Sequence, residues 1–355
     1  GSSMTVSLKE VKTRRDLRLF IHFPFRLYRG DPYWVPGLVA DEWNTLDAKK
    51  NAAFEYSQAR YWLAYKDGKL AGRIAAIISE GHRSHWNQAY MRFGWIEFID
   101  DAEVSAALLG AVEAWAKEVG CTAVHGPMGF SDMDHAGMLV EGFTKLPTMI
   151  NIYNYAYFPQ HLERLGYAKD TDWVEYELTV PQTLDPRITK LSEIILKRNG
   201  LHMLNARSKK DLLPYAHRIF NLLNEAYSKL YGFVPLNEKQ IEDYTKQYFG
   251  FIKPEFVPVV LNDQDEVVAF GITMPSLTRA LQKARGYLFP LGFIHVLHAL
   301  NHNNRGDLYL VAVKPELQGL GLNALLINQV FEAFRKAGII KVESNPELEI
   351  GRAHV

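Results

Sequence analysis

The sequence contains a single cysteine, Cys121, in 355 residues. One thiol excludes a disulfide framework and any zinc site built on cysteine pairs, and it is typical of a protein of the reducing cytoplasm. Neither sign of charge is in excess, because 40 Lys and Arg balance 40 Asp and Glu, which argues against a dedicated nucleic-acid binder. The longest nearly apolar stretch, Tyr287–Leu300, contains Pro290, His295 and His298. It falls short of the ~18 residues of a membrane-spanning helix, so we expect no integral membrane segment.

The order of the predicted elements indicates two domains, as the length also does at about 150 residues per domain. The first half reads helix, hairpin, strand, helix, strand: Lys12–Tyr28, Tyr61–Tyr65 with Leu70–Ser79, Phe93–Ile99, Val104–Val119 and Thr122–His125, with Trp173–Val180 as a closing strand. The second half restarts with strand Leu201–Ala206 and helices Lys210–Tyr231 and Glu238–Phe249. It continues with hairpin Val257–Leu261 and Val267–Met274, strand Leu308–Val313, helix Leu322–Ala337 and strand Ile339–Ser344. We therefore predict an α/β protein with mixed sheets, built from domains at residues 4–180 and 201–355 and a linker helix within 181–200.

One segment, a strand followed by a glycine-containing turn, has the pattern of a phosphate-binding site. The strand Leu308–Val313 runs through Lys314-Pro315-Glu316 into a turn that contains Gly319 and Gly321, and that turn opens a helix. The first amides of a helix have no partner within it, and the helix dipole is positive there. Glycine lets the backbone approach an anion closely, so this turn is a candidate phosphate site.

The segment resembles the pyrophosphate loop of the GNAT superfamily of acyl-CoA N-acyltransferases, Gln/Arg-x-x-Gly-x-Gly/Ala, which typically follows Val-x-Pro-Glu. Here Val313-Lys314-Pro315-Glu316 precedes Gln318, Gly321 and Asn323, and Asn323 stands where the family prefers Gly or Ala. The resemblance implies two tandem GNAT-like lobes that use acetyl-CoA or another acyl-CoA as co-substrate, without a metal. It assigns cofactor binding to a group of residues in the second lobe: Val311, Val313, Gln318, Gly319, Leu320, Gly321, Leu322, Asn323 and Asn345.

The first half resembles the same family less closely. Asn154-Tyr-Ala156 through Gly166-Tyr167 resembles the family's closing motif, but Leu162 stands where many members carry a tyrosine that protonates the CoA thiolate. Phe98-Ile-Asp-Asp101 leads into the next helix without a glycine turn, and its carboxylates would repel a pyrophosphate. We therefore predict that only the second lobe binds CoA. That lobe lacks a last helix and strand pair after Ser344, so either the sequence is truncated or the first half completes the second.

Ionisable residues that could move a proton follow the strand Thr122–His125, in Asp132-Met133-Asp134-His135 and at Glu141. A carboxylate or a neutral histidine can take a proton from an acceptor ammonium, directly or through water. We predict Asp134, His135 and Glu141 as candidate catalytic residues, although loops of this composition often only cap turns. Tyr309, on the strand before the glycine turn, is a further candidate that could equally be a core residue.

The segment Ser276–Asn304 separates two strands that a compact GNAT lobe would join by a short turn. It is too apolar for a disordered loop, so we predict a wall or lid of the acceptor pocket, packing against the first lobe being the alternative. The many apolar residues of this segment favour an acceptor or an acyl chain with apolar surface. His295, His298 and His302 share one helical face, and we favour pocket lining over a zinc site because no carboxylate shares the spacing.

These observations lead to one main functional hypothesis. The protein is predicted to be a cytoplasmic acyl-CoA-dependent N-acyltransferase, in which a small-molecule or lipid-like amine attacks the thioester directly. No nucleophile motif indicates a covalent intermediate. Two alternatives stay open: a peptide aminoacyltransferase that uses aminoacyl-tRNA on the same fold, and a non-catalytic binding protein that has kept the GNAT fold.

Overall fold

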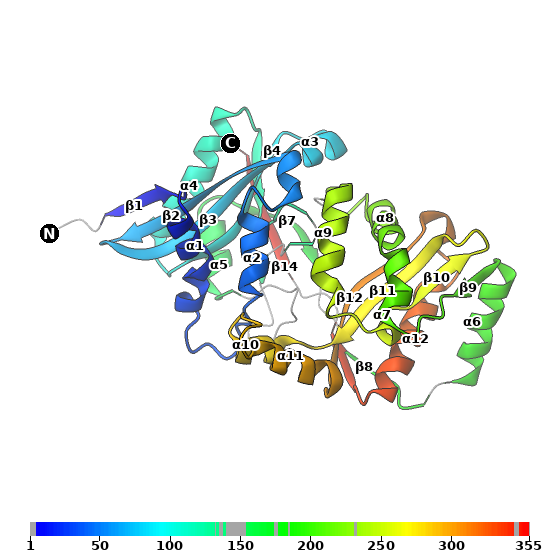
Figure 1. The fold of residues 1–355 in the computed structure, drawn as a ribbon. Helices are drawn as coiled ribbons and strands as arrows, with labels where there is room; N and C mark the ends of the chain where they lie inside the picture. The colour runs from blue at the N-terminus through cyan, green and yellow to red at the C-terminus, as the bar shows by residue number, and fades with distance from the viewer. Residues whose placement is uncertain are drawn as a thin grey trace.

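The computed structural model describes residues 5–131, 133–134, 138–139, 154–173, 177–183, 185–230, 233–343 and 348–354, with only the backbone at 138–139, 171–173, 177 and 348–354. Two sheets with their helices lie side by side, one formed mainly by the first half of the chain and one mainly by the second (Figure 1). Mixed α/β lobes in tandem are what the sequence predicts.

The first sheet runs in the order β1-β2-β3-β4-β5-β14-β6, and β7 also pairs with β14. Its strands are β1 (Val6–Glu10), β2 (Ser57–Lys66), β3 (Lys69–Ser79), β4 (Tyr90–Phe98), β5 (Ala123–Gly126), β6 (Met138–Leu139), β7 (Ala168–Trp173) and β14 (Leu348–His354). Helices α4 (Ala102–Glu118) and α5 (Tyr157–Arg164) pack on Trp62, Ala64, Ile74 and Ala76. Helices α1 (Arg14–Leu27) and α2 (Val39–Leu46) pack on Tyr61, Leu63, Ala75 and Ile77. Because neighbouring residues of a strand point to opposite faces, the two helix pairs cover opposite faces of the sheet.

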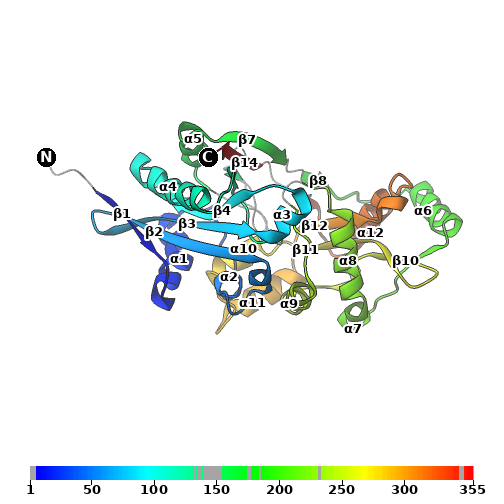
Figure 2. The same ribbon diagram turned by 90° about the horizontal axis from the view of Figure 1, so that it is seen from above.

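The second sheet runs in the order β8-β13-β12-β11-β10-β9. Its strands are β8 (Glu177–Thr179), β9 (Leu201–Met203), β10 (Val259–Asn262), β11 (Val267–Pro275), β12 (Arg305–Val313) and β13 (Lys341–Glu343). One face is covered by α8 (Ala216–Ala226) and α9 (Glu238–Phe249), and the other by α12 (Leu322–Lys336). Helix α6 (Pro186–Arg198) packs beside α12 through Ile195 and Leu196. Figure 2 shows the same arrangement from above.

The two halves exchange strands. β8 precedes the linker helix but pairs antiparallel with β13 of the second sheet. β14 follows every element of the second half but pairs antiparallel with β5 and β7 of the first sheet. Of the two alternatives that the sequence left open, the structure shows the first half contributing to the second sheet. The strand expected over Trp173–Val180 therefore does not simply close the first half.

Local structure departs from the sequence-based expectation at two places. The long helix expected over Lys210–Tyr231 is broken near Pro214 into α7 (Lys209–Leu212), a 3-10 turn (Leu213–Tyr215) and α8, because proline lacks the amide that a continuous helix uses. Ser276–Asn304 contains two helices, α10 (Thr278–Ala284) and α11 (Gly292–Asn301), which pack on β11, β12 and Leu38 of the first half. A short helix, α3 (Glu80–Trp86), and 3-10 turns Ala52–Glu55, Pro254–Phe256 and Pro315–Leu317 complete the fold. Among the described residues no helix is both long and apolar enough to cross a membrane.

Candidate active site

The glycine turn lies at the C-terminal end of β12, in the position that the sequence predicts. Pro315–Leu317 forms a 3-10 turn, Gly319 and Gly321 have φ angles of +88° and +90°, and Leu322 begins α12. Left-handed backbone favours glycine, which explains both residues. Gln318, Gly319, Leu320, Gly321 and Asn323 are exposed, whereas Leu322 is buried against Leu325 and Leu326. The turn therefore presents backbone rather than side chains to solvent.

The N-terminus of α12 is open to an anion. No described side chain accepts a hydrogen bond from its first turn, and that turn contains no acidic residue. Unpaired first-turn amides and the positive end of the helix dipole together favour a phosphate group. The turn can therefore hold the pyrophosphate of CoA with its own backbone.

Strand β12 has a partly unpaired edge next to this turn. β13 pairs with β12 only over Arg305–Asp307, and in the described part of the chain no strand continues that pairing beyond Asp307. On its other edge β12 pairs with β11, with Leu308 opposite Thr273 and Leu310 opposite Ile272, so Tyr309 forms a β-bulge. The side chain of Val313 is buried and that of Val311 half-buried, and the Val311 carbonyl accepts a hydrogen bond from the Tyr227 hydroxyl at 3.1 Å.

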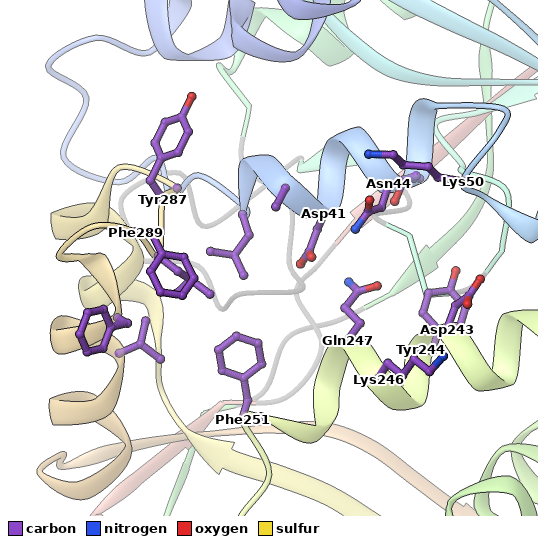
Figure 3. Close-up of a pocket in the computed structure, with 18 of the residues that line it drawn as sticks. Asp41, Asn44, Lys50, Asp243, Tyr244, Lys246, Gln247, Phe251, Tyr287 and Phe289 are labelled. Atoms are coloured by element: carbon purple, nitrogen blue, oxygen red, sulfur yellow. The ribbon is translucent and has the colours of Figure 1, made fainter.

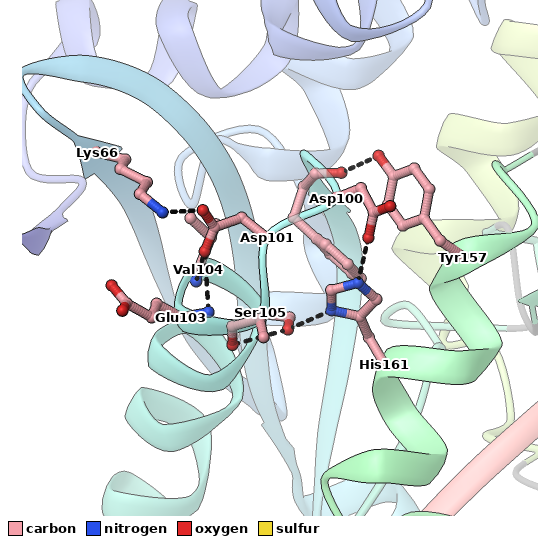
Figure 4. A network of polar contacts seen from close by, with 10 residues as sticks. Lys66, Asp100, Asp101, Glu103, Val104, Ser105, Tyr157 and His161 are labelled. Atoms are coloured by element: carbon pink, nitrogen blue, oxygen red, sulfur yellow. Dashed lines mark hydrogen bonds and ion pairs between the residues drawn. The ribbon is translucent and has the colours of Figure 1, made fainter. Parts of the chain in front are cut away.

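The corresponding helix of the first lobe has a closed N-terminus. The Asp101 carboxylate accepts hydrogen bonds from the amides of Glu103 at 2.9 Å and Val104 at 3.3 Å, and it pairs with Lys66 (Figure 4). Burial raises the pKa of Asp101, but the ion pair and the two amide bonds outweigh it and hold that pKa below its ordinary value. A carboxylate thus occupies the place that a phosphate would need.

Asp100 and α5 add to this closure. Asp100 contacts Nε2 of His161 at 2.7 Å, and the Nδ1 atom of the same ring lies 2.6 Å from the Ser105 hydroxyl of α4. Figure 4 shows His161 between Ser105, in the first turns of α4, and Asp100, which precedes the N-cap residue Asp101. The network ties α5 to the start of α4, beside the amides that Asp101 already occupies.

The seam between β4 and β5 is also filled in the first lobe. After β5 the chain stays against β4, because the Met128 amide donates to the Phe93 carbonyl at 2.8 Å. A side chain at Gly94 would come within 2.2 Å of the Met128 carbonyl oxygen, so glycine is required for this close approach. β12 of the second lobe has no such neighbour in the described residues beyond Asp307.

Three cavities meet between the two lobes at Tyr244 of α9. The largest, about 810 Å³, lies between α2, α9 and the α10–α11 segment, and Figure 3 shows Asp41, Gln247, Phe251 and Phe289 around it. A second, about 170 Å³, is lined by Arg73, Trp95, Glu97 and Asp134 of the first lobe and by Tyr244 and Tyr248. The third, about 150 Å³, extends from Asp134 and Tyr244 to Tyr309 and Leu310 of β12. Tyr244 thus lines all three cavities, and the third extends from it to the bulged strand.

Asp134 is one of the two predicted catalytic residues that line these cavities, Tyr309 being the other. Its Oδ2 atom accepts hydrogen bonds from the amides of Phe130 at 2.8 Å and Ser131 at 3.2 Å. Burial raises the pKa of Asp134 to about 7 in spite of these two bonds. A carboxyl group with that pKa is divided between its two protonation states near neutral pH, as a general base requires.

Tyr309 lies at the other end of the third cavity. It is buried, and its hydroxyl donates to the Asp307 carboxylate at 3.3 Å. Burial and the neighbouring Asp307 raise the pKa of Tyr309 well above its usual range, so it stays protonated at physiological pH. It can act only as a hydrogen-bond donor or a core side chain there, and not as a base.

The other predicted residues divide into two groups. The cofactor-binding residues from Val311 to Asn323 lie together along β12 and the glycine turn, whereas His135, Glu141 and Asn345 lie outside the described residues. Sequence reasoning missed Tyr244, Gln247 and Tyr248, whose spacing of three and four along a predicted helix could have indicated one lining face. It also missed Asp41, whose pKa burial raises to about 6.

Within the described residues, no three His, Cys, Asp or Glu side chains gather as metal ligands would. His298 and His302 stack with ring centroids 4.7 Å apart.

A glycine turn before an uncapped helix, beside a bulged strand with a partly free edge, is the arrangement that the resemblance to the GNAT superfamily predicts. Residues 216–348 match the family model described as "Acetyltransferase (GNAT) family". The chain therefore contains a GNAT acetyltransferase domain in its second half, the domain of acyl-CoA-dependent N-acyltransferases.

Two curated relatives are similar along most of the chain. One is "Protein YghO" of Escherichia coli, 29% identical over 325 residues that cover 91% of this chain and 82% of the relative. The other is "Bacterial ceramide synthase" of Caulobacter vibrioides, 29% identical over 304 residues that cover 84% of this chain and 78% of the relative.

Solved structures agree on the fold. A tandem GNAT protein from the clavulanic acid biosynthesis pathway aligns with a TM-score of 0.53 at 10% identity, covering 99% of this chain and 98% of that one. A GCN5-related N-acetyltransferase from Sphaerobacter thermophilus aligns with a TM-score of 0.51 at 12% identity, covering 98% of this chain and 95% of that one. Two tandem GNAT-like lobes are therefore the architecture of this protein.

Proposed function

We propose that the protein is an acyl-CoA-dependent N-acyltransferase that transfers its acyl group to the amine of a lipid-like acceptor. The observation that carries the proposal is a cavity of about 810 Å³ with one apolar wall. It shares Tyr244 with a smaller cavity that is lined by Asp134 and by Tyr309 of the strand leading into the glycine turn. The cavity would hold the acceptor, and the turn would hold the cofactor.

Acyl-CoA would bind along β12. The amides of Gln318–Asn323 would hold the pyrophosphate, with Gly319 and Gly321 allowing its close approach. The backbone at Val311 and Val313, next to the partly free edge of the strand, would contact the pantetheine arm and the oxygen of the reacting carbonyl. Asn345 would belong to the same site by its family resemblance.

The acceptor would react as a neutral amine. An ammonium group bound near Asp134 would give its proton to the carboxylate, directly or through water, and the freed nitrogen would attack the thioester carbon. The carbon–sulfur bond would then break, and the CoA thiolate would take up a proton. Tyr309, which stays protonated, is a candidate hydrogen-bond donor close to this step. His135 and Glu141 are further candidates for the proton transfer.

The acceptor class follows from the lining of the largest cavity and from one relative. Leu38, Phe251, Phe289, Phe293, Val296, Leu297 and Leu300 form an apolar wall, which suits an alkyl chain better than a sugar or a polyamine. The name of the Caulobacter relative denotes synthesis of a ceramide, the N-acyl derivative of a long-chain amino alcohol. A long-chain amine or amino alcohol is the acceptor that both observations support.

Thiol release from acyl-CoA tests the proposal. We expect release with a long-chain amino alcohol as acceptor, and little or none with a polyamine or an amino sugar. Acetyl-CoA and a long-chain acyl-CoA, offered separately, distinguish short from long acyl transfer. CoA binding without release for any amine would favour the non-catalytic alternative, and transfer that needs aminoacyl-tRNA would favour the peptide aminoacyltransferase.

A further inference from the structure

The α10–α11 segment exposes a group of large apolar side chains. Phe289 is 77% exposed, Leu291 65%, Leu297 52% and Ile294 51%. Apolar side chains that are exposed singly need no explanation, but a group on one short segment marks an interaction surface. Phe289 and Leu297 line the largest cavity and are also exposed to solvent, so they mark its mouth, and this surface adjoins the proposed acceptor site.

The charges of the segment have one sign. Residues 276–304 contain no Asp or Glu, while Arg279, Lys283 and Arg285 are exposed on and just after α10. The molecule as a whole has equal numbers of acidic and basic residues, so a stretch of this length without an acid is a local feature. Its field would attract an anionic surface.

Helix α1 adds a basic face beside the apolar group. Nε2 of His22 lies 2.6 Å from the hydroxyl of Tyr287, so α1 contacts the connection between α10 and α11. Arg18 and Arg26 lie one helical turn before and after His22, and therefore on its side of the helix. Both arginines are exposed, and neither forms an ion pair with a described residue.

We propose that Leu291, Ile294 and their apolar neighbours, together with Arg18 and Arg26, form a surface that docks on an anionic lipid bilayer. Apolar side chains would enter the headgroup region, and the arginines would contact lipid phosphates. The protein would lie on the membrane without spanning it. The mouth of the largest cavity would then face the bilayer, so a lipid-like acceptor could enter without crossing water.

Charge favours a bilayer over a second copy of this chain as the occupant. A symmetric dimer through this face would bring two segments without acidic residues together, and like charges across an interface are unfavourable. An anionic bilayer matches both the apolar and the basic parts. Docking itself does not depend on the proposed transfer reaction, although it would supply that reaction with its acceptor.

Vesicle flotation tests the proposal. The full-length protein is mixed with phosphatidylglycerol-containing vesicles or with pure phosphatidylcholine vesicles, at low and high salt. We expect binding to the anionic vesicles that is at least about tenfold stronger than to the neutral ones and that weakens with salt, because headgroup attraction is screened.

A matched pair of variants locates the surface. Leu291→Ser with Ile294→Ser removes two exposed apolar side chains that do not line the cavity. Leu191→Ser with Ile194→Ser makes the same change, at the same spacing and similar exposure, on α6, far from α10–α11 in both views. We expect the first variant to lose at least about tenfold in vesicle binding, and the second to bind like the wild type.

Several outcomes would overturn the proposal. These are absence of wild-type binding to anionic vesicles, equal binding by the Leu291/Ile294 variant, or a greater loss in the α6 variant. Dimerisation that the Leu291/Ile294 variant abolishes, without vesicle binding, would assign the surface to a second copy. CoA titration of both variants checks their folding, and thiol release with acceptor in detergent shows whether the proposed function stands independently of docking.

Discussion

Gly321 and Asp101 occupy equivalent places, each immediately before a helix that follows the fourth strand of a lobe. Gly321 leaves the first amides of α12 open, whereas Asp101 uses those of α4 for its own carboxylate. The residue at this place is thus one of the features that set whether the helix start is available to a phosphate, together with the His161 network and the filled seam of the first sheet. The difference is the chemical reason why we expect the two lobes, alike in fold, to differ in CoA binding.

Gly321→Glu should abolish measurable CoA binding, because it puts a carboxylate beside the open amides. Loss of a single charge-assisted hydrogen bond costs about 2 kcal/mol, so we expect the Kd to rise at least about 30-fold. Calorimetric titration with CoA measures the Kd of the wild type and of each variant. Gly338→Glu is the control: Gly338, at the other end of α12, has a φ of +79° and free space around it, so backbone strain and added charge are the same. Similar affinities in the two variants would contradict the site.

Asp134→Asn should remove the general base and keep the fold. The amide oxygen of asparagine can still accept from Phe130 and Ser131, so the turn persists. We expect kcat to fall about 10²-fold or more with CoA affinity unchanged. In the wild type, kcat/KM should fall as pH drops below about 7, where the carboxylate becomes protonated, and this limb should disappear in the variant. An unchanged pH profile would show that another group takes the proton.

The stability of the Asp134→Asn variant shows whether a loss of activity comes from the missing base or from damage to the fold. The pKa of Asp134 is higher in the folded protein than its ordinary value, so the folded state binds the proton more tightly than the unfolded chain does. The carboxyl group therefore costs stability as pH rises from about 4 to 7, and that cost is absent at lower pH. Asp134→Asn should be at least as stable as the wild type at pH 7 in urea unfolding, and marked destabilisation there would make its loss of activity uninformative.

At the scale of elements, the α10–α11 segment packs on both lobes. Its core includes Leu281, Val296 and Leu300 with Tyr309 of β12 and Leu38 of the first lobe, and the Gly286 carbonyl accepts from the Val39 amide at 2.9 Å. It packs against Tyr309 in the middle of β12, while the glycine turn follows the C-terminal end of that strand. The predicted wall of the acceptor pocket and the alternative of packing against the first lobe are therefore compatible.

Replacing Gly286–His302 by a short Gly-Ser turn should spare CoA binding and remove acyl transfer. The deletion takes away one wall of the largest cavity, Tyr287 to Leu300, but no residue of the glycine turn. Calorimetry with CoA and thiol release with a long-chain amine measure the two effects separately. Full turnover in the deletion variant would show that the segment has no part in acceptor binding, and loss of CoA binding would indicate a general loss of structure.

At the scale of the whole molecule, the lobes share an architecture, but we expect only the second to bind a cofactor. We expect one CoA per chain in equilibrium titration, because Asp101 caps α4 and Met128 fills the seam of the first sheet. A stoichiometry near two would show that the first lobe also binds. Asp101→Gly should leave the stoichiometry at one, since the filled seam at Gly94 still excludes the pantetheine arm.

Local patterns in the sequence predict the parts of the site that are contiguous. The strand, the Pro-Glu turn and Gly319 to Asn323 form one short run, and the structure keeps them together. The cavities join residues from Asp41 to Tyr309, and no periodicity relates α2 to α9 or to the α10–α11 segment. The pKa of Asp134 depends on that burial and could not be foreseen. The positions of β8 and β14 depend on pairing between distant segments, which local propensity does not determine.

The position of β14 has a consequence for the order of events during synthesis. Residues Leu348–His354 lie between β5 and β7 in the first sheet, so that sheet cannot be completed until the ribosome has made the whole second lobe. Meanwhile β5 presents an edge of unpaired backbone groups, which is a template for wrong pairing with another chain. The first sheet therefore stays incomplete while the second lobe is being translated. The shorter the time until β14 is synthesised, the less the exposed edge of β5 can aggregate.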